Sequence, residues 1–117
     1  MKLTEIPFTD AQPIDGYGPG FFRVGGNVVE GACLVTSERV VSWGGYDDSA
    51  ALEALEGKVD VVFIGTGAEI GHVPPALRAR LEALGLGVEN MNSPAACRTY
   101  NVLLSEGRRV AAALLPV

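Results

Sequence analysis

The sequence predicts a single α/β domain with a mixed central sheet, and two patterns along the chain carry that prediction. Residues 1–45 contain short apolar runs separated by glycine and polar turns, which is typical of antiparallel strands. Residues 46–117 alternate apolar strands with amphipathic helices, which is typical of parallel β-α-β units. The 117 residues are 48% hydrophobic, a length and composition that suit one compact domain. We therefore expect one domain over residues 1–117, with a β-meander half followed by a βαβαβ half.

The N-terminal half, residues 1–45, is expected to form an antiparallel β-meander. The dipeptide Gly25-Gly26 separates two apolar runs and is favoured in tight hairpins. Three glycines within residues 14–20 predict a loop there, because glycine permits backbone angles that other residues avoid. The expected strands cover residues 2–8, 21–24, 27–37 and 39–44.

The C-terminal half, residues 46–117, is expected to form a β-α-β-α-β unit with a right-handed parallel core. Asp48 or Ser49 would cap a helix that precedes the unit, and Ser93 would be the N-cap of its last helix. Arg108-Arg109 open the last strand, and such charges are typical of an exposed sheet edge. The expected helices cover residues 47–57, 74–85 and 93–107, and the expected strands cover 59–64, 87–91 and 108–116.

Composition and charge narrow the possible function classes. The net charge of −5 and the pI near 4.7 disfavour a nucleic-acid binder, which needs a basic face. The sequence lacks the run of about 18 apolar residues that a membrane span needs, and its N-terminal residues lack the apolar core of a signal peptide. Cys33 and Cys97 lie in no metal-like spacing and are expected to be reduced. We therefore expect a cytoplasmic protein with no metal and no cofactor.

The first candidate site is the glycine-rich turn at residues 65–67, which follows a buried strand. In dinucleotide folds such a turn cradles a pyrophosphate, and Glu89 lies where a ribose-binding acid would be expected. Two features argue against this interpretation: the spacing of the glycines in residues 65–71 departs from G-x-G-x-x-G, and Pro74-Pro75 delay the next helix. We therefore prefer the alternative that the glycines let the turn clear the sheet edge.

The second candidate site is the start of the last helix. A step of about 100° per residue places these residues on one polar face: Pro94, Cys97, Arg98, Asn101 and Ser105. The opposite face would carry Ala95, Ala96, Thr99, Val102 and Leu103. A helix N-terminus beside Arg98 would lower the pKa of the Cys97 thiol and attract an anion, and His72 is expected at the same sheet edge. A Cys97–His72 pair, a small-anion pocket at Arg98, and an exposed helix face with Arg98 paired to Glu106 all remain open.

The chain as a whole resembles the small Mth-type domain family. The resemblance is carried by "GYGPGFFRVGG", by the tryptophan of "VVSWG", by "VVFIGTG", and above all by "GVENMNSPAACRTYNVLLSEGRRVAAALLP". This family includes the mitochondrial NADH dehydrogenase complex I assembly factor 3 and the adipogenesis-associated Mth domain-containing protein. The resemblance implies a three-layer β+α/β/α arrangement around the mixed sheet. It also implies a non-enzymatic role in partner binding or assembly, linked to respiratory complex I or to membrane-protein biogenesis.

These observations lead to one functional hypothesis and one alternative. The hypothesis is a protein-binding module in which the turn after the first parallel strand and the start of the last helix form a shallow cleft at the carboxyl edge of the sheet. The alternative is an enzyme that binds a small anion or nucleotide through the 65–67 turn and the Cys97/Arg98 helix start. The candidate cleft comprises Gly65, Thr66, Gly67, His72, Ser93, Cys97, Arg98 and Asn101.

Overall fold

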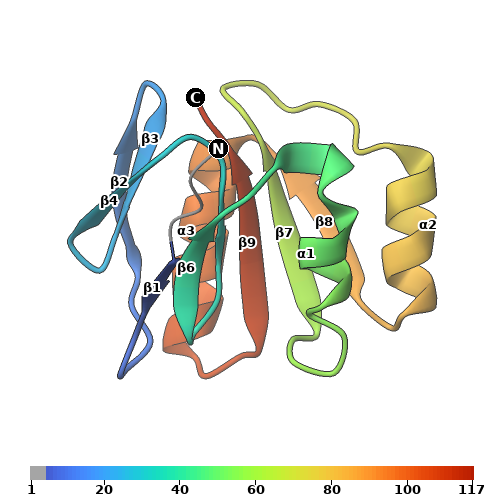
Figure 1. The fold of residues 1–117 in the computed structure, drawn as a ribbon, viewed down its shortest axis with the longest axis horizontal. Helices are drawn as coiled ribbons and strands as arrows, with labels where there is room; N and C mark the ends of the chain where they lie inside the picture. The colour runs from blue at the N-terminus through green and yellow to red at the C-terminus, as the bar shows by residue number, and fades with distance from the viewer. Residues whose placement is uncertain (1–4) are drawn as a thin grey trace.

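A six-stranded mixed sheet forms the centre of the protein (Figure 1). The structure is a computed structural model that describes residues 5–117. The strand order is β1-β6-β5-β9-β7-β8, in which β7 is parallel to both β8 and β9 and the other pairs are antiparallel. The strands are β1 (Glu5–Pro7), β5 (Cys33–Val35), β6 (Arg39–Ser42), β7 (Val61–Thr66), β8 (Gly87–Met91) and β9 (Val110–Leu115).

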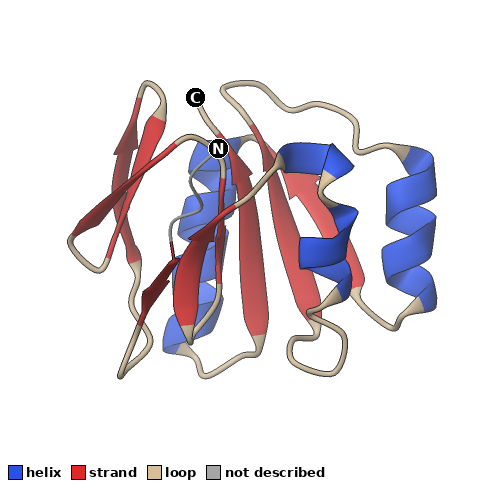
Figure 2. Cartoon of the chain, viewed as in Figure 1, coloured by secondary structure: helices blue, strands red, loops and turns tan. Residues whose placement is uncertain are grey.

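A small antiparallel sheet and three α-helices cover the two faces of the central sheet (Figure 2). One face packs against α3 and the small sheet, and the other packs against α1 and α2. This three-layer arrangement confirms the predicted α/β class with a mixed central sheet. The small sheet comprises β2 (Ile14–Gly18), β3 (Phe21–Val24) and β4 (Asn27–Glu30), and the helices are α1 (Ser49–Glu53), α2 (Pro75–Ala83) and α3 (Ser93–Ser105), with a 3₁₀ turn at Gly45–Asp47.

The predicted β-α-β-α-β unit is confirmed as β7-α2-β8-α3-β9. Strand β8 has the predicted bounds, whereas β7 begins and ends two residues later than expected and β9 begins at Val110. Helix α1 is shorter than predicted. Asp48 occupies its N-cap position, but the Asp48 carboxylate accepts a hydrogen bond from the N–H of Gly44 (3.1 Å) instead of a helix N–H.

The N-terminal half differs from one continuous meander in two ways. Residues 14–18 form strand β2 and not a loop, because Gly16 and Gly18 avoid positive φ and the chain turns only at Gly20 (φ 79°). Gly31 (φ 79°) then breaks the expected strand over residues 27–37 into β4 and β5, which lie in different sheets. The hairpin at Gly25-Gly26 is confirmed by their φ values of 56° and 81°. Residues 2–4 of the first expected strand lie outside the described residues.

The predicted faces of α3 are wrong. Its buried residues are Ser93, Ala96, Cys97 and Tyr100, whereas Val102 is 56% exposed. Asn101 is half-buried and does not face solvent as a polar surface residue would, because its side chain binds the backbone of β2. The Asn101 amide accepts from the N–H of Ile14 (2.8 Å) and donates to the Ile14 carbonyl (2.9 Å). Asn101 therefore ties the small sheet to α3 in the way that a neighbouring strand would.

We expect Asn101→Ala to lower the free energy of unfolding by about 1–3 kcal/mol, because it leaves the N–H and C=O of Ile14 without their partners. Chemical denaturation measures this loss. Asn27→Ala, which removes only long contacts in an exposed turn, should change stability by less than about 0.5 kcal/mol. Equal effects of the two substitutions would show that Asn101 does not hold the small sheet in place.

Candidate functional site

The turn after β7 and the start of α3 lie side by side, as the sequence predicts for the carboxyl edge of parallel strands. The N–H of Ser93 donates to the Gly67 carbonyl (2.7 Å), and the N–H of Gly67 donates to the Ser93 hydroxyl (2.9 Å). That hydroxyl in turn donates to the carbonyl of Leu115 at the end of β9 (2.6 Å). Ser93 is fully buried, so its side chain serves this internal junction and faces no cleft.

Ser93 is free for this role because it is not the N-cap of α3. The cap is Asn92, whose side-chain oxygen accepts from the N–H of Ala95 (2.8 Å). Gly65 allows the helix to come this close to the sheet. A Cβ at Gly65 would lie 2.7 Å from the Ser93 hydroxyl and 2.9 Å from both the Ser93 Cα and the Leu114 side chain. The absence of a side chain at position 65 is thus required by helix packing.

The rest of the turn is closed by its own hydrogen bonds. The Thr66 hydroxyl donates to the Glu69 carbonyl (2.7 Å) and accepts from the N–H of Gly71 (2.9 Å). The Gly71 carbonyl accepts from Asn90 (2.8 Å), which Arg78 holds in place (2.8 Å). A phosphate-binding loop needs free N–H groups that point at the ligand. Here the N–H groups of Gly67 and Gly71 are both occupied, which favours the structural interpretation of the glycines.

Both thiols are buried in the core and are poor nucleophiles. Cys97 is 4% exposed and Cys33 is fully buried, in the same hydrophobic cluster. Burial raises the pKa of Cys97 to about 11, although the nearby charge of Arg98 acts in the opposite direction. Burial also raises the pKa of Cys33 to about 12. The helix start therefore does not activate the Cys97 thiol, because desolvation outweighs the attraction of the guanidinium.

Arg98 and His72 are the two candidate residues whose side chains remain exposed. Within residues 5–117, the Arg98 side chain makes no hydrogen bond or ion pair, and the expected pair with Glu106 is absent. The described contacts likewise include no hydrogen bond between His72 and Cys97. Arg98 lines a hollow of 290 Å³ together with Thr99, Val102 and Leu103.

The structure therefore divides the candidate cleft into two parts. Arg98 and His72 are exposed, whereas the other members serve internal contacts: Gly65, Thr66, Gly67, Ser93, Cys97 and Asn101. Val102, which the sequence pattern placed on the apolar face of the helix, is instead exposed beside Arg98. It lies one helical turn after Arg98, so the two side chains are neighbours on the surface of α3.

Two further properties of the described residues bear on the kind of site. Within residues 5–117, no helix combines the length and the apolar character needed to cross a bilayer. No group of three or more His, Cys, Asp or Glu side chains in this part of the chain is arranged to hold a metal ion.

The fold is that of an Mth938-like α/β domain. A solved Bordetella pertussis protein described as a Mth938-like domain is 31% identical to this chain, with a TM-score of 0.77 over 99% of this chain and 92% of that one. The model of the family described as "Protein of unknown function (DUF498/DUF598)" matches residues 14–115. The chain belongs to this family, which confirms the resemblance inferred from the sequence.

Two relatives are similar to this chain over almost all of its length. An uncharacterised protein of Rhodobacter capsulatus is 56% identical over 117 residues, which cover all of this chain and 94% of that protein. The mouse protein named NADH dehydrogenase [ubiquinone] 1 alpha subcomplex assembly factor 3 is 32% identical over 123 residues, which cover 99% of this chain. The match spans 66% of the mouse protein, so that relative is longer.

We expect Ser93→Ala to destabilise the protein by about 1–3 kcal/mol, because it leaves the buried N–H of Gly67 and the carbonyl of Leu115 without partners. Urea denaturation provides the measurement. Ser105→Ala, the same change at an exposed position of α3, should cost less than about 0.5 kcal/mol. A Ser93→Ala protein as stable as the Ser105→Ala protein would argue against the junction.

The buried thiols predict a loss of stability at alkaline pH. Their pKa values of about 12 and about 11 in the folded state lie above the ordinary value of 9.0, so the stability they contribute is fully present below pH 9.0 and declines as the pH rises toward 11. The free energy of unfolding of the wild type should therefore fall more steeply over this range than that of a Cys33→Ala/Cys97→Ala variant. Parallel curves for the two proteins would contradict the prediction.

Proposed function

We propose that this protein is a partner-binding or assembly module, and that its contact surface is the exposed face of α3 formed by Arg98, Thr99, Val102 and Leu103. One observation carries the proposal: Arg98 is exposed and has no partner among the described residues, directly beside a Val102 that is 56% exposed. An arginine next to exposed apolar side chains is the composition that protein interfaces favour at their centres. We call these four residues the α3 surface.

The chemistry of the α3 surface suits a partner that presents a carboxylate beside an apolar group. A guanidinium forms bidentate hydrogen bonds with a carboxylate, which fixes the orientation of the partner as well as its position. Val102 and the half-buried Leu103 would then exclude water from the edge of that contact. The same hollow could accept a small anion, but a free anion would make no use of the apolar side chains.

Two further observations support an assembly role over the alternative enzyme. The relatives named as assembly factors align with nearly the full length of this chain. Two of the groups that the alternative enzyme would use are engaged elsewhere, since the N–H groups of Gly67 and Gly71 are bonded internally and Cys97 is buried. The partner that we propose is a component of respiratory complex I or of another membrane-protein assembly. We infer that the protein has this assembly role in the cytoplasm, because reduced cysteines such as Cys33 and Cys97 are typical of a reducing compartment.

Arg98→Glu and Val102→Glu should each abolish the capture of a specific partner protein. The first substitution repels the partner's carboxylate, and the second puts a charge where the partner's apolar group would pack. Both positions are exposed, so the melting temperature should change by less than about 3 °C. Affinity capture from cells of the source organism, followed by quantitative mass spectrometry, measures the first effect. Thermal unfolding measures the second.

Arg23→Glu is the matched control, because it makes the same charge change at an exposed arginine on the small sheet. It should leave the capture intact. The proposal fails if Arg98→Glu retains every partner that the wild type captures, or if Arg23→Glu loses the same partners. A collapse of the melting temperature in Arg98→Glu would show instead that the guanidinium is structural.

A further inference from the structure

A hollow of 270 Å³ lies at the end of the central sheet opposite to the Ser93 junction. It is bordered by Arg108 and Arg109, which precede β9, and by Lys58, which precedes β7. Since β7 and β9 are parallel, these residues meet at the amino ends of the two strands. The expectation that Arg108-Arg109 protect a sheet edge is wrong, because β9 lies between β5 and β7 in the sheet interior. The two arginines therefore need another explanation.

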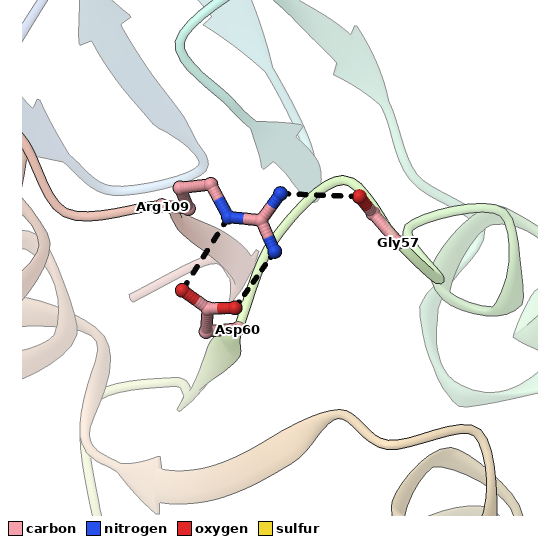
Figure 3. Close-up of polar contacts among 3 residues, drawn as sticks. All are labelled: Gly57, Asp60 and Arg109. Atoms are coloured by element: carbon pink, nitrogen blue, oxygen red, sulfur yellow. Dashed lines mark hydrogen bonds and ion pairs between the residues drawn. The ribbon is translucent and has the colours of Figure 1, made fainter.

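Arg109 holds the loop before β7 in place (Figure 3). Its guanidinium binds both carboxylate oxygens of Asp60, at 2.8 and 3.4 Å, and donates to the Gly57 carbonyl at 3.2 Å. These hydrogen bonds lower the pKa of Asp60, to which the charge of Arg108 also contributes. Arg109 is thus neutralised by Asp60, and it fixes the loop that carries Lys58.

Lys58 and Arg108 remain as two cations that form no ion pair among the described residues, although the charge of Arg108 reaches Asp60. Both are exposed, and neither side chain makes a hydrogen bond or ion pair within residues 5–117. Three of the nine lysines and arginines of the chain line this one hollow, and no acidic residue lines it. The hollow is therefore a positively charged site on a chain whose net charge is −5.

The floor of the hollow is apolar. Val59 and Val110 are buried and Leu104, from the end of α3, is half-buried. An apolar floor with cations at the rim matches an occupant that combines an apolar side chain with flanking carboxylates. The volume of 270 Å³ is slightly below the range of about 300–1,000 Å³ that is usual for small-molecule sites, but it can admit a side chain of a protein segment.

We propose that this hollow binds an acidic segment of a partner protein, with an apolar side chain of the segment on Val59, Leu104 and Val110 and its carboxylates on Lys58 and Arg108. The site shares no lining residue with the α3 surface, so it goes beyond the proposed function and stands or falls separately. A nucleic acid is disfavoured as the occupant, because two free cations in an acidic chain neutralise few phosphates.

The test uses a short fluorescein-labelled peptide of alternating glutamate and leucine, titrated with the full-length protein at low ionic strength and followed by fluorescence anisotropy. Arg108→Glu and Lys58→Glu should each weaken binding about tenfold, because each puts a negative charge against the carboxylates of the peptide. Arg23→Glu, with the same change in net charge, should stay within about twofold of the wild type. Backbone amide shifts in NMR spectra should be largest at the residues of the hollow.

Each alternative outcome overturns the proposal. An equal loss in Arg23→Glu would show that only the net charge matters, and equal binding of the matched glutamine-leucine peptide would show that the cations are not used. Amide shifts confined to the α3 surface would place the peptide elsewhere, and equally tight binding of a short oligodeoxythymidine would identify a general anion site. An absence of measurable binding to the wild type would also reject the hollow as a site for acidic segments. None of these outcomes would alter the capture experiment on Arg98.

Discussion

The buried hydroxyl of Ser93 is the interaction on which the arrangement of this protein depends. It accepts from the turn after β7 and donates to the end of β9, so one side chain joins two strands of the sheet to the first turn of α3. The contact is possible only because Gly65 has no side chain, since a Cβ there would occupy the space of Ser93 and Leu114. A buried hydroxyl that makes both of its hydrogen bonds is stabilising, whereas one that loses them is costly. The junction therefore fixes where the helix begins and how closely it lies on the sheet.

Because the start of α3 is fixed, the burial and the contacts of its other residues are fixed as well. The buried face of the helix brings Cys97 and Tyr100 into the core that the two sheets share. One turn further on, Asn101 reaches the backbone of β2 and brings the small sheet against the same face of the central sheet. The opposite side of the helix is left with Arg98 and Val102 directed at solvent. The surface available to a partner is thus a consequence of the internal junction.

The same geometry distinguishes the glycine-rich turn after β7 from the phosphate-binding turn of dinucleotide folds. In dinucleotide folds the turn leaves its N–H groups free at a helix N-terminus. Here Ser93 and Thr66 accept the N–H groups of Gly67 and Gly71, and the first turn of α3 is closed by Asn92.

The sequence by itself determined the order of the C-terminal strands and helices, because buried β-branched runs, proline helix starts and glycine helix ends are local signals. It also determined the hairpin at Gly25-Gly26, which needs only two residues with positive φ. Tertiary structure decided the rest. Asn92 displaced Ser93 as the cap of α3 because the Ser93 hydroxyl has two partners on other elements, and Asn101 is held inward by a strand that is 87 residues away. No local pattern reveals such partners, since the physical reason for each residue's role lies on a distant part of the chain.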